Sequence, residues 1–115
     1  MEIARIYSRA LAVIDSQQVT VDIHVSPGLP KFHIVGLPET EVKESRERVR
    51  SALLTNHFEF PIRRITVNLA PADLPKQGGR YDLAIAVGIL AATGQVSRDA
   101  LSSHEFIGEL SLAGE

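Results

Sequence analysis

Residues 63–94, RRITVNLAPADLPKQGGRYDLAIAVGILAATG, combine a strand pattern, a loop and a helix pattern. Apolar and polar side chains alternate in residues 63–71, which predicts a half-buried strand. Residues 83–94 are apolar nearly all round, which predicts a buried helix that ends at Gly94. A strand, a glycine-containing loop and a helix in this order can bind phosphates. The loop at residues 71–82 therefore decides whether the fold carries such a site.

The loop PADLPKQGGRYD (71–82) lacks the pattern of a nucleotide-binding loop. The pattern G-x-x-x-x-G-K-[ST] is not met, because Lys76 precedes Gly78 and no Ser or Thr follows. A dinucleotide-binding loop needs G-x-G-x-x-G, which the pair Gly78 and Gly79 does not supply. We interpret the two glycines as residues that allow positive φ, and Asp82 as the cap of the following helix.

Three further strands are predicted before this stretch. Residues 3–13, 19–25 and 31–36 alternate between apolar and polar side chains, most strictly in VTVDIHV (19–25). Proline and glycine in SPGLP (26–30) supply a turn between the second and third of them. The N-terminal third is therefore predicted to be an antiparallel meander.

An amphipathic helix of roughly 15 residues is predicted over residues 40–54, after Pro38. At the other end, residues 104–115 resemble a strand, a short break and a second strand that enters a turn. We expect a returning partner for that strand, so residues 1–115 are interpreted as a single domain and as a fragment of a longer protein, truncated at its C-terminal edge. The predicted fold is α+β, in the order β-β-β-α-β-α-β-β, with two helices on one face of a mixed sheet.

Composition excludes several classes of function. The net charge of −2 gives the whole molecule no electrostatic attraction to nucleic acid or to an anionic membrane, so a binding face must be local. The absence of cysteine excludes disulfides, thiolate metal sites and a cysteine nucleophile. No signal peptide or membrane-spanning apolar run is present, so a cytoplasmic protein without membrane contact is expected.

Carboxylates and histidines offer two candidate sites for enzyme chemistry. Asp73 and Asp82 could form a pair for acid–base catalysis or for magnesium, although turn and capping roles are the simpler interpretation. His24 and His33 lie on consecutive predicted strands with the same outward facing, beside Asp22, which allows a two-histidine, one-carboxylate metal site. Polar residues on the wet face of a hairpin are the simpler interpretation.

Basic residues offer a candidate contact surface for DNA or for a neighbouring subunit. Within residues 43–50 the cations alternate with glutamates, which favours a solvated face with salt bridges. Outside that helix, fewer acidic residues lie among the cations. The predicted contact residues are Arg63, Arg64, Lys76 and Arg80.

Four long stretches together resemble the N-terminal domain of the ComM/YifB family of magnesium-chelatase-like AAA+ ATPases. They are ARIYSRAL, SPGLPKFHIVGLPETEVKESRERVRSAL, FEFPIRRITVNLAPADLPKQGGRYDLAIAVGILAATGQ and FIGELSLAGE, at residues 4–11, 26–53, 58–95 and 106–115. The resemblance covers nearly the whole chain in order. It implies a fold of the Lon-protease-domain or ribosomal-protein-domain-like superfold, followed by an AAA+ module.

The resemblance also implies a function for the parent protein. Members of this family resemble hexameric DNA helicases that promote branch migration during natural transformation. ATP and magnesium would then bind in the AAA+ module beyond Glu115, and this domain itself would hold no cofactor. Its partners would be its own AAA+ module, neighbouring subunits of a homohexamer and DNA.

Peptidase activity is not expected from the loop. In Lon-type peptidases a Pro-Lys-x-Gly loop presents the serine nucleophile, and here Pro75, Lys76 and Gly78 are kept while Arg80 or its neighbours stand where the serine would fall. The leading interpretation is a non-catalytic domain for hexamer assembly or DNA engagement. The alternative is a stand-alone hydrolase or metal-dependent enzyme that uses residues 71–82.

Overall fold

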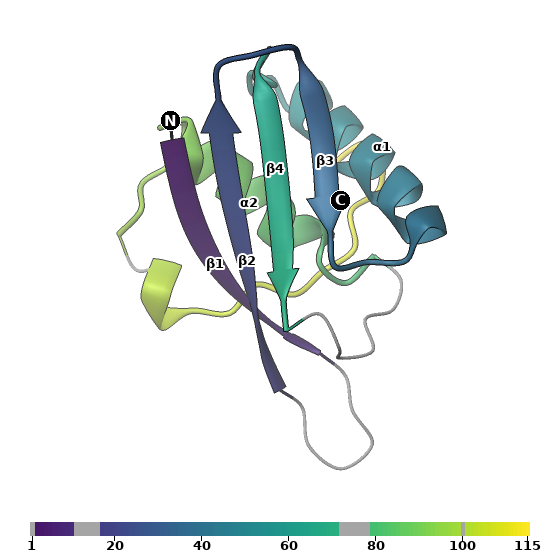
Figure 1. Ribbon diagram of the computed structural model, residues 1–115, viewed down its shortest axis with the longest axis vertical. Helices are drawn as coiled ribbons and strands as arrows, with labels where there is room; N and C mark the ends of the chain where they lie inside the picture. Colours follow the sequence, from purple (N-terminus) through teal and green to yellow (C-terminus); the bar gives the residue numbers. More distant parts are fainter. Residues whose placement is uncertain (1, 11–16, 72–78, 100) are drawn as a thin grey trace.

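One mixed sheet of four strands forms the frame of the molecule, in the order β1-β2-β4-β3 (Figure 1). The computed structural model describes residues 2–10, 17–71, 79–99 and 101–115. β1 is antiparallel to β2, β2 is antiparallel to β4, and β4 is parallel to β3. The strands are β1 (Glu2–Ala10), β2 (Gln17–Ser26), β3 (Lys31–Val35) and β4 (Arg64–Ala70).

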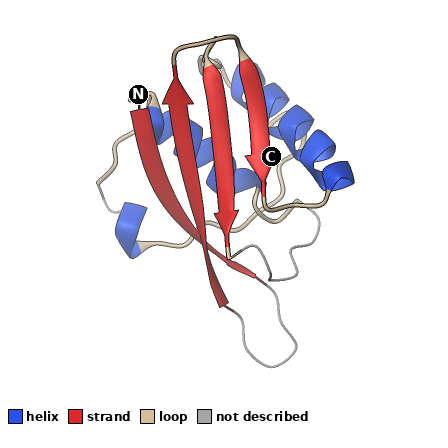
Figure 2. Ribbon diagram, viewed as in Figure 1, coloured by secondary structure: helices blue, strands red, loops and turns tan. Residues whose placement is uncertain are grey.

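Both α-helices cover the same face of the sheet, as Figure 2 shows, and no described helix covers the other face, which we call the open face. They are α1 (Glu39–Thr55) and α2 (Asp82–Ala92), and a short 3-10 helix, η1 (Leu101–Ser103), follows. The predicted α+β class, with a mixed sheet and two helices, is confirmed. Within the described residues, no helix is both long enough and apolar enough to cross a membrane.

The core lies between the sheet and α2. The alternation in β2 sends its apolar side chains inward, where Val19, Val21, Ile23 and Val25 are fully buried. α2 is buried nearly all round because it packs against β1 and β2 of the sheet and against α1. A Cβ at Gly88 would lie 2.2 Å from Ile23 Cδ1, so this helix approaches β2 too closely for a larger residue.

The amphipathic pattern of α1 is confirmed. The helix begins directly after Pro38, and its first turn carries Glu39 and Glu41, which favour the positive end of the helix dipole. The buried side chains are the ones that the helical spacing predicts, namely Val42, Ser45, Val49, Ala52 and Leu53. All but one are apolar, and the exception, Ser45, belongs to a polar cluster that joins the two helices.

The predicted antiparallel meander is wrong, because β4 lies between β2 and β3. Ser26 and Lys31 both lie level with Arg64, on opposite sides of it. The turn at residues 27–30 therefore crosses over the end of β4 instead of forming a tight hairpin. Parallel strands need a crossover connection, and α1 supplies it between β3 and β4.

The two strands predicted within residues 104–115 are also wrong. This segment has one isolated bridge, between Tyr7 and Glu105, and otherwise runs irregularly across the helices. Its backbone is held at separate points: Phe106 N donates to Tyr7 O at 2.8 Å, Leu83 N donates to Gly108 O at 3.0 Å, and Ser51 Oγ donates to Leu112 O at 2.9 Å. Since it crosses several elements instead of following one, no ladder forms.

Candidate functional site

A buried ion pair marks the place where the loop at residues 71–82 enters α2. The side chain of Asp82 is fully buried and accepts a hydrogen bond from Arg48 Nε, 2.6 Å from its Oδ2. Ser45 Oγ donates to Asp82 Oδ1 at 2.6 Å, and the backbone N–H of Leu110 donates to Oδ2 at 3.2 Å. The hydrogen bond from Arg48 to Asp82 raises the pKa of Arg48, so the guanidinium stays charged.

The predicted capping role of Asp82 is wrong, because α2 begins at Asp82 itself, after Tyr81, without a side-chain cap. The carboxylate turns toward α1 instead. The role predicted for Gly79 also differs, since its φ is not in the positive range. A Cβ there would lie 2.7 Å from Arg48 Nη2 and 2.9 Å from Asp82 Oδ2. This glycine leaves room for the ion pair.

The predicted contact surface does not assemble from its described members. Arg80 Nε donates to the carbonyl of Arg9, which lies level with Gln18. Arg64 lies level with Ser26, so these two levels are about 26 Å apart along the sheet at roughly 3.3 Å per residue. Arg63 adjoins Arg64 and pairs with Glu2 at 2.7 Å. Lys76, Gly78 and Asp73 lie outside the described residues.

The proposed histidine site has both rings on the open face of the sheet but on strands that are not neighbours. His24 and His33 each lie level with Thr66, which stands between them on β4. Their Cα atoms are thus separated by two strand spacings, about 10 Å. Among the described residues there is no group of three or more potential metal ligands.

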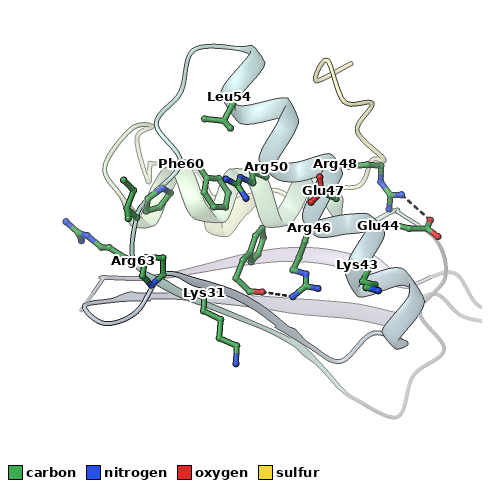
Figure 3. Close-up of a pocket in the computed structure, with 14 residues that line it drawn as sticks. Lys31, Lys43, Glu44, Arg46, Glu47, Arg48, Arg50, Leu54, Phe60 and Arg63 are labelled. Atoms are coloured by element: carbon green, nitrogen blue, oxygen red, sulfur yellow. Dashed lines mark hydrogen bonds and ion pairs between the residues drawn. The ribbon is translucent and has the colours of Figure 1, made fainter.

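A different surface, which we call the basic groove, gathers cations between α1, the edge strand β3 and the segment before β4 (Figure 3). Its volume is about 900 Å³. The groove combines positive charge with apolar side chains. It is lined by Pro30, Lys31, Phe32, Lys43, Glu44, Arg46, Glu47, Arg48, Arg50, Leu54, Phe60, Pro61, Ile62 and Arg63.

The charges of the chain are distributed unevenly around this groove. Its lining holds six of the twelve Lys and Arg residues of the sequence but two of the fourteen Asp and Glu residues. Two of the six cations are paired from outside the lining, Arg48 by Asp82 and Arg63 by Glu2. The other four have no described carboxylate within ion-pair distance: Lys31, Lys43, Arg46 and Arg50.

Aromatic contacts hold the middle of the groove in place. Arg50 Cζ lies over the ring of Phe60, 5.8 Å from its centroid, at a distance typical of a cation–π contact. The ring of Phe60 also packs against Phe32, with centroids 5.5 Å apart. Arg46 Nη1 donates to the carbonyl of Phe32 at 3.0 Å, as the dashed line in Figure 3 marks. The groove is therefore a positively charged surface with an ordered apolar wall.

Helical spacing could have identified this groove in the sequence. A count of charges treats residues 43–50 as balanced, but Lys43, Arg46 and Arg50 are spaced by three and four residues and so share one face of α1. The aromatic partners are harder to predict. Phe60 follows the helix in an irregular segment, and only the crossover from α1 to β4 brings it beside Phe32.

Comparison with known proteins places the chain in a family. Residues 21–115 match the family described as subunit ChlI of Mg-chelatase. The chain belongs to the ChlI family. Within it, the resemblance to the N-terminal domain of the ComM/YifB proteins is confirmed by relatives that match along the whole sequence.

Three relatives illustrate the range of similarity. The chain is 54% identical to Competence protein ComM of Haemophilus influenzae, over 100% of this chain and 23% of that protein. It is 50% identical to uncharacterized protein YifB of Escherichia coli, over 99% of this chain and 22% of that protein. An uncharacterized protein of Mycobacterium tuberculosis is 39% identical over 99% of this chain and 23% of its own length. The chain thus spans less than a quarter of the length of these relatives.

Proposed function

We propose that this chain is the N-terminal accessory domain of a ComM-like AAA+ ATPase, in which it engages DNA and supports hexamer assembly during branch migration in natural transformation. Membership of the ChlI family and the 54% identity to Competence protein ComM support this assignment. The ATPase activity belongs in this proposal to the rest of the parent protein, where ATP and magnesium bind.

The observation that carries the proposal is the concentration of cations in the basic groove. A chain with a net charge of −2 keeps four cations there without described carboxylate partners. Grouped Lys and Arg side chains attract the phosphates of a nucleic-acid backbone, because their binding releases condensed counterions. DNA phosphates are therefore the partner that this surface suits best.

The domain contributes binding and no catalytic residue in this proposal. The hydroxyl of Ser45 and the carboxylate of Asp82 are buried and bound to each other and to Arg48, so neither faces a substrate. We expect no ATP hydrolysis by the purified 115-residue chain. Hydrolysis above the background of a buffer control would contradict this part of the proposal.

DNA affinity and assembly of the full-length parent protein test the two roles separately. We expect DNA binding that weakens steeply as salt is raised. Arg50→Glu should reduce the affinity, whereas the matched reversal Arg64→Glu, on the open sheet face, should have a smaller effect. The mass of the assembled protein is measured for both variants. Loss of the hexamer in Arg50→Glu with unchanged DNA affinity would favour assembly, and absence of DNA binding at low salt would reject the DNA role.

A further inference from the structure

We propose that the basic groove binds single-stranded nucleic acid, with phosphates on the α1 cations and unpaired bases against the apolar wall formed by Phe60, Leu54 and Ile62. This inference rests on the proposed DNA role and specifies the form of nucleic acid that the groove accepts. Two features carry it: the position of apolar side chains among the cations, and the size of the groove.

The cations that face the groove lie in a row along α1. Lys43, Arg46 and Arg50 are spaced by three and four residues, which places successive positive charges along one helix face. Figure 3 shows their side chains along the side of α1 that borders the groove. A row of this kind suits a linear polyanion, whose phosphates repeat along the chain.

The apolar wall beside this row is exposed to solvent. Leu54 is 50% exposed and Ile62 is 84% exposed, although both are large hydrophobic residues. Phosphates alone would gain nothing from these side chains. Unpaired bases have apolar faces that bury such surface, and they stack on aromatic rings and on guanidinium groups. The Arg50–Phe60 pair offers both kinds of stacking surface at one position.

The size of the groove suits a short stretch of a flexible strand. A volume of about 900 Å³ falls in the range of sites for small molecules, which is enough for a few nucleotides. Duplex DNA keeps its bases stacked inside, away from the apolar wall. A single strand can place its phosphates and its bases in the groove together.

An acidic peptide fits the groove less well than a nucleic acid. β3 is an edge strand, and extended peptides bind such edges by adding a strand through backbone hydrogen bonds. Here Arg46 already donates to the carbonyl of Phe32, which faces that edge. Strand addition would have to displace this contact. A nucleic acid would contact the side chains of the groove and would not need the backbone of β3.

The test compares the binding of labelled oligothymidine and of a duplex of equal length to the full-length parent protein by fluorescence anisotropy. Ile62→Ser removes exposed apolar surface from the groove, and Leu29→Ser is the matched control, because Leu29 is 87% exposed but does not line the groove. We expect Ile62→Ser and Phe60→Leu to weaken oligothymidine binding about fivefold or more, with duplex binding unchanged. Leu29→Ser should change neither affinity.

Several outcomes would overturn the inference. If Ile62→Ser and Phe60→Leu weaken both forms of DNA equally, or neither, the bases do not contact the wall, and the proposed DNA role stands without it. Competition with polyglutamate, which carries charge but no bases, is the second measurement. Displacement of oligothymidine by polyglutamate at the same charge concentration would show recognition of charge alone. Absence of binding to any DNA would reject the proposed function itself. Thermal melting of Phe60→Leu separates lost stacking from lost folding.

Discussion

Asp82 and Arg48 form the contact that joins α1, α2 and the C-terminal segment at one buried point. The two side chains meet at 2.6 Å, and the same carboxylate binds Ser45 of α1 and the backbone of Leu110. Gly79 closes over the pair from the preceding loop. Because one carboxylate accepts hydrogen bonds from three residues, its loss should weaken the contacts of α1 and of the C-terminal segment with α2 together.

Asp82→Ala is expected to destabilise the chain by about 3–5 kcal/mol, the usual cost of removing one partner of a buried ion pair. Arg48, whose side chain is 17% exposed, would keep its charge without the Asp82 carboxylate. Asp82→Asn should cost less, because its one amide oxygen still accepts from Ser45 or from Leu110, which donate to different oxygens of the carboxylate. Urea denaturation of the three proteins measures the free energies of unfolding.

Glu44→Gln provides the control for this prediction. Glu44 also pairs with Arg48, at 3.5 Å, but its side chain is 68% exposed. Exposed pairs one helical turn apart contribute about 0.3–0.5 kcal/mol. A loss of stability in Glu44→Gln as large as in Asp82→Ala would show that burial of the Asp82 pair has no special importance.

Gly79→Ala should destabilise the chain by about 1–3 kcal/mol through overpacking. The added Cβ would lie 2.6 Å from Glu109 Cγ as well as close to the buried ion pair. Gly108→Ala is the matched control, since a Cβ there meets Leu83 at an ordinary 3.6 Å. Thermal unfolding compares the two variants. Equal melting temperatures would contradict the packing role that we assign to Gly79.

The pair of Arg9 and Glu105 is expected to make stability depend on pH. The hydrogen bond from Arg9 lowers the pKa of Glu105 below its ordinary value. A carboxylate with a lowered pKa stabilises the folded state above its unfolded pKa, and this stabilisation is lost as pH falls through the folded pKa. Urea midpoints at neutral and at acidic pH should therefore differ less in Glu105→Gln than in the unmodified chain. An identical difference in both proteins would contradict the assignment.

The four strands and two α-helices of this fold were predictable from periodicity, but the irregular C-terminal segment and the order of strands in the sheet were not. Alternation in β2 and helical spacing in α1 report which side chains are buried. They do not report which strands are neighbours. The turn at residues 27–30 has the composition of a hairpin, and the crossover by α1 is what places β4 between β2 and β3. Such pairing depends on contacts between distant parts of the chain.

The candidate site was predictable only in part, for a similar reason. Asp82 precedes an apolar run in the sequence, which is the usual position of a cap, and its true partner, Arg48, lies 34 residues earlier. The basic residues of α1 were visible in the sequence, but helical geometry is needed to show that Lys43, Arg46 and Arg50 share one face. Arg63 and Arg80 were grouped as candidate contacts by their charge, whereas β4 places them at opposite ends of the sheet.

Arg46 is expected to protect the edge of β3 from pairing with another chain. Edge strands expose backbone groups that can pair with a second copy, and charged side chains at an edge oppose this. Arg46 covers the Phe32 carbonyl, so Arg46→Ala should increase self-association of the chain, measured by sedimentation over a range of concentrations. Arg64→Ala removes the same charge from the open face, and it should leave the association unchanged. If Arg46→Ala stays monomeric at all concentrations, another element keeps the edge unpaired. If both variants associate equally, net charge and not this hydrogen bond keeps the edge unpaired.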